Sequence, residues 1–228
     1  KHWTERLEPE LYLQYQELWP MSYDQVGDII IFKLPEELTS FSKEIANAML
    51  QQYQNARLIC ADYGVKGEFR VRDLKSIVSR DGNLSTKTQV KEHGNTFLVD
   101  PSVAYFSPRL ATERLATLET AISLKQELGR PLTICDPYAG SGPALAPLVS
   151  HDSLVGQIIA SDLNPNAVSL LKENLPSEAI IDCCDARELK SKFPEKVDLL
   201  LVNLPHESLN HLPDLIPLMA KNHPVVIR

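Results

Sequence analysis

The sequence predicts an α/β protein in which a domain with a mostly parallel sheet follows a small α+β domain. Two observations predict this division. Up to about residue 106, short β-type runs are separated by turn residues and interrupted by one helical stretch. From residue 107 onward, short apolar runs alternate with segments of helical periodicity, which is the pattern of βαβ units and a parallel sheet. We therefore expect a small α+β domain over residues 1–106 and an α/β domain over residues 107–228.

In the smaller domain the expected elements follow from apolar runs and the turn residues between them. Thr39 or Ser40 is expected to cap a helix over Thr39–Gln54. Asp81-Gly82-Asn83 has hairpin chemistry and is expected to join two successive strands, and His93-Gly94-Asn95 is expected to form a second turn. Strands are expected over Ile29–Phe32, Ala56–Ala61, Glu68–Val71, Leu74–Val78, Thr86–Val90 and Thr96–Val99.

In the larger domain strands and helices alternate. Ser107-Pro108 is expected to open an amphipathic helix that Gly129 ends. The apolar residues Leu115, Leu118 and Ile122 repeat at helical spacing and predict its buried face. Further helices are expected around Ala144–Val149 and after Asn164-Pro165, and strands over Leu132–Cys135, Gln157–Ala160, Ala179–Ile181, Val197–Val202 and Val225–Ile227.

Composition limits the classes of function. Hydrophobic residues make up 43% and charged residues 23% of the 228-residue chain, as in ordinary soluble proteins. No apolar run approaches the about 18 residues of a membrane span and no secretory leader opens the chain, so we expect a cytoplasmic protein without membrane contact. The four cysteines form no CxxC pair and the six histidines show no ligand spacing. We therefore expect buried, apolar cysteines and no metal site.

The charge is unevenly distributed along the chain. The net charge of −7 is unfavourable for binding nucleic acid, since phosphate neutralisation dominates such binding. Residues 57–114, however, hold ten basic and seven acidic side chains, a difference of +3. This stretch is either the electrostatic footprint of a nucleic acid or the solvated surface of β-hairpins, and composition alone leaves both open.

A glycine-rich segment, Asp136–Pro143, follows the strand that ends at Cys135. In open parallel sheets the ligand lies beyond the carboxyl ends of the strands. Gly140 and Gly142 allow the backbone to approach a ligand closely, and the amides that enter the next helix favour an anionic group. Asp136 could also act as a structural acceptor for the turn itself.

Further acidic and amide side chains follow the next three expected strands. Asp162 is placed to accept the two hydroxyls of a ribose, whereas Asn164 is better placed to cap the following helix. Asp185 follows the third strand, where an acid could meet an adenine amine. Asn203, before Leu204-Pro205, follows the fourth strand and could bind the edge of a base. Taken in order, these residues indicate a nucleoside-containing ligand.

These segments, together with three upstream ones, resemble the archaeal and eukaryotic tRNA (guanine-37-N1)-methyltransferases. The related aminocarboxypropyl transferases of the wybutosine pathway share the motifs. The resemblance implies a Rossmann-like class I methyltransferase domain over residues 107–228, S-adenosylmethionine as cofactor, and the anticodon stem-loop of tRNA as partner of residues 1–106. A monomer is expected. The matching segments are Asp136–Pro143, Asp162-Leu163-Asn164-Pro165, Asn203-Leu204-Pro205, Tyr23–Ile29, Gly67–Arg72 and Tyr105–Arg114.

The resemblance also implies roles for single residues. Glu113 matches the general base that removes the N1 proton of guanine, and Arg70 or Arg72 matches the arginine that balances charge on the guanine oxygen. Asn203 would hold the base edge and belongs to the same catalytic set. The expected cofactor-binding residues are Tyr105, Asp136, Tyr138, Gly140, Gly142, Asp162, Asn164, Asp185 and Asn203, and the expected substrate contacts are Arg109, Asn203 and Pro205.

Two other functions remain open at this point. One is transfer of the aminocarboxypropyl group of S-adenosylmethionine to a wybutosine precursor in tRNA, and the other is RNA binding without catalysis. Glu113 and Arg109 favour methylation, whereas Ala116 and His206, where the family often has basic residues, favour a non-catalytic relative. The chain opens at Lys1 and its predicted sheet ends at a fifth strand, so we expect a fragment, a chain with disordered ends or a reduced variant.

Overall fold

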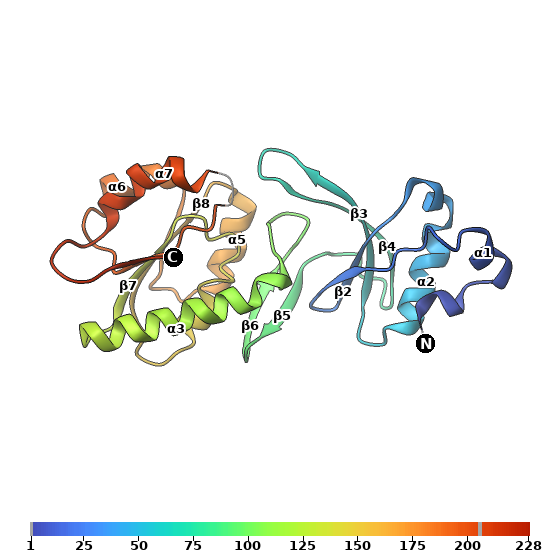
Figure 1. Cartoon of the computed structure of the whole chain (residues 1–228), viewed down its shortest axis with the longest axis horizontal. Helices are drawn as coiled ribbons and strands as arrows, with labels where there is room; N and C mark the ends of the chain where they lie inside the picture. Colours follow the sequence, from blue (N-terminus) through green and yellow to red (C-terminus); the bar gives the residue numbers. More distant parts are fainter. Residues whose placement is uncertain (1, 205–206) are drawn as a thin grey trace. The chain divides into compact units, whose positions relative to one another are not determined.

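The computed structural model describes residues 2–204 and 207–228, and the chain divides into two compact units (Figure 1). The N-terminal unit consists of the chain up to Val90 together with Val99–Pro108. The C-terminal unit consists of Lys91–Leu98 and Arg109–Arg228. Lys91–Leu98, the end of a β-hairpin, thus belongs to the C-terminal unit. In the sequence it lies between two parts of the N-terminal unit.

The N-terminal unit is built on one four-stranded sheet. Its strand order is β1-β2-β3-β4, with β2 and β3 parallel and the two outer pairs antiparallel. The helix α2 packs on β3 and β4, and its buried residues Ile45 and Met49 join Trp3, Phe32 and Ile59 in one core. The elements are η1 (Trp3–Arg6), α1 (Pro9–Gln14), β1 (Tyr23–Val26), β2 (Ile29–Lys33), η2 (Glu36–Phe41), α2 (Ser42–Gln52), β3 (Leu58–Lys66) and β4 (Val71–Ser79).

The predicted start of the first long helix is wrong. Pro35 precedes a 3₁₀ turn over Glu36–Phe41, in which the N–H of Leu38 donates to the carbonyl of Pro35 at 3.0 Å. Helix α2 begins only at Ser42, and no side chain caps it. Thr39 and Ser40 lie inside the tighter turn, so their hydroxyls are not at the position of an N-cap.

The predicted strand over Glu68–Val71 and the predicted hairpin at Asp81-Gly82-Asn83 are also wrong. Strand β3 runs to Lys66, the chain turns, and β4 returns antiparallel to β3 from Val71. Asp81-Gly82-Asn83 instead forms a bend in which Asp81 Oδ1 accepts the N–H of Asn83 at 2.9 Å. Bends and hairpin turns both use such side-chain to backbone hydrogen bonds, so the same residue types occur in both. This explains why the sequence suggested a hairpin here.

A separate two-stranded hairpin, β5 (Thr88–Glu92) and β6 (Asn95–Val99), follows. His93 and Gly94 both have positive φ angles, +48° and +82°, which confirms the predicted turn there. The start of the hairpin passes close to Gly27, where a Cβ atom would lie 2.3 Å from the carbonyl oxygen of Gln89. Only glycine fits at position 27, because the backbone there also has a left-handed φ of +57°.

The C-terminal unit confirms the predicted Rossmann-like fold. Its five-stranded sheet is all parallel, in the order β11-β10-β7-β8-β9, so the strand order reverses at β7. A ligand of such a sheet binds where the order reverses, beyond the carboxyl ends of β7 and its neighbours. The elements are α3 (Ala111–Leu128), β7 (Leu132–Asp136), α4 (Ala146–Val149), β8 (Val155–Asp162), α5 (Pro165–Asn174), β9 (Ile180–Cys183), η4 (Ala186–Glu188), α6 (Leu189–Lys192), β10 (Leu199–Leu200), α7 (Ser208–Leu215), η5 (Ile216–Leu218) and β11 (Val226–Ile227).

Helices cover both faces of this sheet (Figure 1). On one face Ile134 of β7 packs with Leu124 of α3 and with α5. On the other face the next residue, Cys135, packs with Leu189 of α6 and Leu215 of α7. The alternation of neighbouring residues between two cores fixes the register of β7, and so fixes where its carboxyl end lies.

The predicted opening of helix α3 is wrong by one turn. Pro108 begins a 3₁₀ turn, η3 (Pro108–Leu110), and α3 starts at Ala111. At its other end Gly129, with φ +65°, donates its N–H to Lys125 as the predicted cap. Of the predicted apolar face of α3, Leu118 and Ile122 pack against the core and are partly buried. The buried residues of the helix are Arg114, Thr117, Ala121 and Leu124, so a charged side chain is buried as well.

The buried Arg114 pairs with Glu92 of the β5–β6 hairpin. Its Nε and Nη2 atoms lie 2.6 and 2.7 Å from the two carboxylate oxygens, and both side chains are almost fully buried. A two-pronged pair of this kind satisfies both charges without water. It therefore attaches the β5–β6 hairpin to the first turns of α3, the helix that carries Glu113.

Candidate functional site

Hydrogen bonds around Asp162 join the carboxyl ends of β7 and β8. Asp162 Oδ2 accepts the N–H of Gly140 at 2.8 Å, and Oδ1 accepts the N–H of Asn164 at 2.9 Å. The buried hydroxyl of Ser161 donates to the carbonyl of Pro137 at 3.0 Å. The glycine-rich turn after β7 is therefore fixed to the neighbouring strand at the point where the strand order reverses.

Two carboxyl groups at this edge have raised pKa values. Burial raises the pKa of Asp136 to about 7; the N–H of Tyr138, 3.1 Å from Asp136 Oδ1, acts against this increase, and the charge of Asp162 adds to it. Burial also raises the pKa of Asp162, although the N–H groups of Asn164 and Gly140 act in the opposite direction. A buried carboxyl that titrates near neutral pH in a polar turn is a candidate functional group.

The two glycines of the turn have left-handed backbone conformations. Gly140 has φ +57° and Gly142 has φ +87°. A Cβ atom at Gly142 would lie 2.8 Å from Cδ1 of Leu171 on α5. The left-handed φ and the close Leu171 side chain together favour glycine at position 142, and its contact with a cofactor remains a prediction.

Two asparagines fix the ends of α5. The side chain of Asn164 accepts the N–H of Asn166 at 3.0 Å, which confirms that Asn164 caps the helix. Asn174 donates to the carbonyls of Leu98 and Ser141, each at 2.7 Å, and accepts the N–H of Leu98. No sequence pattern marks Asn174, which links the β5–β6 hairpin to the glycine-rich turn.

Tyr138 and Asp185 each have a partner that the sequence did not reveal. The hydroxyl of Tyr138 lies 2.7 Å from Nδ1 of His211 on α7, and burial raises the pKa of Tyr138 to about 12. The carboxylate of Asp185 accepts hydrogen bonds from the backbone and guanidinium of Arg187, which lower its pKa to about 2. His211 is far from Tyr138 in sequence, and no local pattern could have identified it.

Glu113 lies in the first turn of α3 with its side chain 73% exposed. Its carboxylate is 3.3 Å from Nη2 of Arg228, which also donates from Nε to Thr117 at 2.9 Å. The backbone of Arg228 accepts the N–H of Val202 at 2.7 Å, next to the exposed Asn203. Arg228 thus brings together the segments that carry the predicted base and the predicted amide.

The other predicted residues lie elsewhere. Arg70 and Arg72 are in the β3–β4 hairpin and Tyr105 is exposed, all three in the N-terminal unit. Arg109 is exposed in η3 at the start of the C-terminal unit. Pro205, the last predicted substrate contact, lies outside the described residues, as does His206.

The two arginines of the hairpin differ in environment. Arg72 is 18% exposed and lies between two carboxylates, 2.6 Å from Asp24 and 3.5 Å from Asp62. Arg70 is exposed in the turn with φ +49° and forms no ion pair within the described residues. Of these two arginines, only Arg70 therefore has a guanidinium whose charge is not neutralised by an ion pair in the described part of the chain.

Within residues 2–204 and 207–228, no group of three or more acidic, histidine or cysteine side chains is arranged to hold a metal ion. No helix in the same residues has the length and apolar character of a membrane span. All four cysteines are free. Cys60 and Cys135 are buried as predicted, but the prediction is wrong for Cys183, which is exposed at the end of the edge strand β9.

Comparison with known families gives two matches that together span most of the chain. Residues 4–82 match the model described as the TYW2 N-terminal domain. Residues 88–226 match the model of the TRM5/TYW2 methyltransferase domain.

Individual relatives agree with these matches. The tRNA (guanine(37)-N(1))-methyltransferase Trm5b of Pyrococcus abyssi is 34% identical over 200 residues, which are 84% of this chain and 56% of that protein. Its crystal structure is similar over 100% of this chain and 64% of its own, with a TM-score of 0.78 and 28% identity. The chain thus spans little more than half the length of this relative.

Two further solved structures contain ligands. A complex of aTrm5 with tRNALeu has a TM-score of 0.71 at 28% identity and covers 92% of this chain and 61% of its own. Trm5 of Methanocaldococcus jannaschii in complex with adenosine has a TM-score of 0.69 at 27% identity and covers 100% of this chain and 64% of its own.

Substitution of Gly142 tests whether the turn is fixed by packing. Gly142→Ala should lower the free energy of unfolding by about 1–3 kcal/mol more than Gly82→Ala, because its Cβ would clash with Leu171. Gly82 is a matched control, since it has nearly the same φ, +83°, and open space around it. The measurement is urea denaturation of both variants, and equal losses would contradict the packing argument.

Proposed function

The chain belongs to the TRM5/TYW2 methyltransferase family, and we propose that it transfers a methyl group from S-adenosylmethionine to N1 of guanosine 37 in tRNA. The Pyrococcus abyssi relative is named for this activity, and a similar structure contains tRNALeu. Two observations carry the proposal together: Asp162 holds a glycine-rich turn where the strand order reverses, and Arg228 links the exposed Glu113 to the segment that precedes Asn203. We also propose a monomer that acts in the cytoplasm.

The polar groups around the turn fit S-adenosylmethionine. The half-buried carboxylate of Asp162 would accept the ribose hydroxyls, and the amides of the turn would bind the carboxylate end. Ser141 in the same turn has a buried hydroxyl without a partner among the described residues, so an unused donor is present. Asp185 would accept the adenine amine. When bound, this cofactor supplies a methyl group on a positively charged sulfur, and Tyr105, Asp136, Tyr138, Gly140, Gly142, Asn164 and Asn203 complete its proposed site.

Glu113 would act on the nucleobase. Guanine N1 carries a proton that must leave when the nitrogen attacks the methyl group, and an exposed carboxylate can accept it. As the proton leaves, negative charge grows on the guanine oxygen, which a guanidinium stabilises. Asn203 would hold the base edge, with Arg109 and Pro205 as further contacts to the tRNA.

We assign the charge-balancing role to Arg70. The guanidinium of Arg72 is already paired with Asp24 and Asp62, so much of its charge is neutralised. Arg70 has no such partner within the described residues. Residues 1–106, which contain both arginines, would form the tRNA-contacting domain, and residues 107–228 the methyltransferase domain.

A second function, aminocarboxypropyl transfer from the same cofactor to a wybutosine precursor in tRNA, is favoured by one observation. Residues 4–82 match the TYW2 N-terminal domain. The exposed carboxylate of Glu113 favours methylation, since removal of the N1 proton requires a base. Mass spectrometry of nucleosides separates the two, because the transferred groups differ in mass.

Methylation should depend on Glu113. Unmodified tRNA incubated with the chain and S-adenosylmethionine should yield 1-methylguanosine, and no product should form when position 37 is not guanosine. Glu113→Gln should lower kcat by about 100- to 10,000-fold while cofactor affinity stays unchanged, because the base is lost. Glu119→Gln, an exposed change on the same helix, is the control. Full activity of Glu113→Gln would rule out the proposed base.

The two arginines should separate by stability and activity. Arg70→Ala should leave the Tm close to that of the wild type and lower kcat by about 100-fold, as expected for loss of one transition-state donor. Arg72→Ala should lower the Tm, because Asp24 and Asp62 lose their partner in a largely buried position. Thermal denaturation and single-turnover methylation of both variants test this. Normal activity of Arg70→Ala would contradict the assignment.

Cofactor affinity should rise with pH through neutrality. The pKa of Asp136 is about 7, so its carboxyl is mainly neutral at pH 6 and mainly charged at pH 8. The charged form favours a cationic ligand, so the affinity for S-adenosylmethionine should increase by about 10-fold over this range. Asp136→Asn should abolish the increase, and the exposed Asp152→Asn should not. Calorimetric titration at both pH values is the measurement, and a flat wild-type profile would contradict the role of Asp136.

A further inference from the structure

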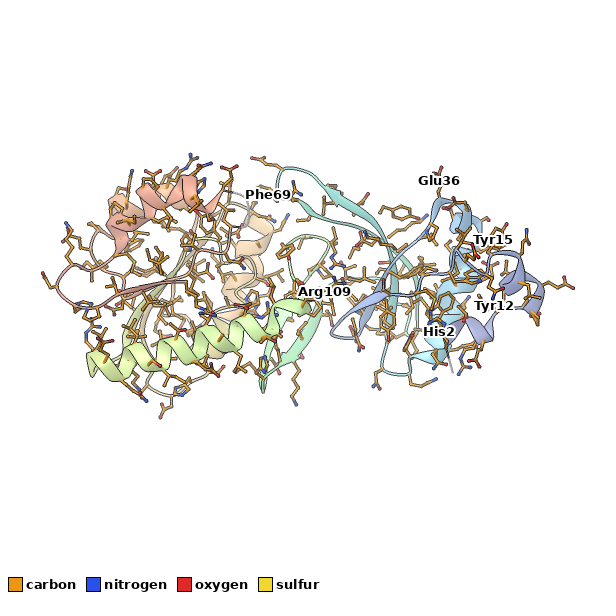
Figure 2. All side chains as sticks on the ribbon, in the orientation of Figure 1. His2, Tyr12, Tyr15, Glu36, Phe69 and Arg109 are labelled. Carbon is orange, nitrogen blue, oxygen red and sulfur yellow. The ribbon has the colours of Figure 1, made fainter. Side chains whose placement is uncertain are left out.

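The β3–β4 hairpin ends in exposed aromatic and apolar side chains. The first four residues of β3 are buried, but Tyr63 is 48%, Val65 60% and Phe69 39% exposed. Figure 2 labels Phe69 at the end of this hairpin, in the turn between the two strands. We call residues 62–70 the hairpin tip. Large apolar groups gathered at the end of a hairpin indicate a surface for contact with another molecule.

The backbone of the hairpin tip is fixed by several specific interactions. Arg70 donates its N–H to the carbonyl of Gly67 at 3.2 Å, and both residues have positive φ angles. Asp62 Oδ1 accepts the N–H of Gly64 at 2.8 Å, at the register shift between Asp62 and Val65. Arg72 then links Asp62 to β1. Phe69 is therefore presented on a fixed turn, so little ordering would be lost on binding.

Charged side chains of both signs surround the tip. Lys66 is paired with Asp73 at 2.6 Å. Arg70 and Lys75 have no ion pair within the part of the chain that the structure describes, whereas the acid Glu68 lies beside Phe69 in the turn. An exposed aromatic ring next to an unpaired guanidinium is a combination that binds single-stranded nucleic acid, through base stacking and phosphate contacts.

We propose that Phe69 stacks on the unpaired base next to guanosine 37, while Lys75 contacts the phosphate backbone. The inference rests on the proposed function, which places the guanidinium of Arg70 at the target guanine. Phe69 directly precedes Arg70 in the same turn, so its ring would meet a nucleotide next to the target guanine. A stacked neighbour would hold the target base clear of the other loop bases.

Three variants separate stacking from apolar packing. Phe69→Leu keeps an apolar side chain but removes the aromatic face, and Phe69→Trp keeps the face. Leu84→Ala removes an exposed apolar side chain outside the tip and is the matched control. Binding of an unmodified tRNA transcript at one fixed salt concentration is measured by fluorescence anisotropy, and S-adenosylmethionine affinity checks the fold. Phe69→Leu should weaken tRNA binding about 5- to 150-fold, whereas the Trp variant and the control stay near wild type.

Transcripts with an abasic nucleotide at position 36 or 38 identify the stacked base. At one of the two positions the missing base should weaken wild-type binding and remove the difference between wild type and Phe69→Leu. The proposal is overturned if Phe69→Leu binds tRNA as tightly as wild type, or if its deficit persists on both abasic transcripts, as it would for a protein-packing role. Either result leaves methylation of guanosine 37 by the wild type intact. Failure of the wild type to bind or methylate tRNA would instead refute the proposed function.

Discussion

The C-terminal unit depends on the carboxylate of Asp162 and the two backbone N–H groups that it accepts. One oxygen holds the glycine-rich turn after β7 through Gly140, and the other holds the start of α5 through Asn164. Without this acceptor both N–H groups would lack a partner at the edge where the strands end, at a cost of about 1–3 kcal/mol each. The same half-buried side chain would meet the ribose hydroxyls of the cofactor. The positioning of the turn and the proposed binding of the ligand therefore use a single group.

The proposed binding of a cationic cofactor would also explain why Asp136 is buried. Asp136 lies beside Tyr138, and burial raises its pKa to about 7. A cationic ligand would shift the balance to the charged form, because opposite charges lower the pKa of an acid. The turn would then become more negative only when the sulfonium is present. Such a change would favour the charged cofactor over its neutral thioether product.

Local patterns predicted the parallel sheet, the cap at Asn164 and the glycine at the end of α3, because each depends on residues close in sequence. The β3–β4 hairpin was not predictable, since its turn at Gly67–Arg70 has a non-glycine residue at positive φ where composition suggested a strand. Of the site, the acids at the strand ends were found from their order along the chain. His211, Arg228 and Asn174 were missed, because each acts on a residue more than about 70 positions away and no periodicity records such contacts.

Arg70 has a positive φ angle although it is not a glycine. A left-handed conformation costs a residue with a Cβ atom about 1–2 kcal/mol, and glycine would avoid this cost. His93, another non-glycine residue with positive φ, uses its side chain within the fold, since its Nε2 atom lies 3.1 Å from the carbonyl of Ala111. The side chain of Arg70 has no such contact in the described residues, so the fold gains nothing from it that would offset the strain. Strain without an internal contact is expected where a side chain serves a ligand, and this supports the proposed role of the Arg70 guanidinium at the RNA.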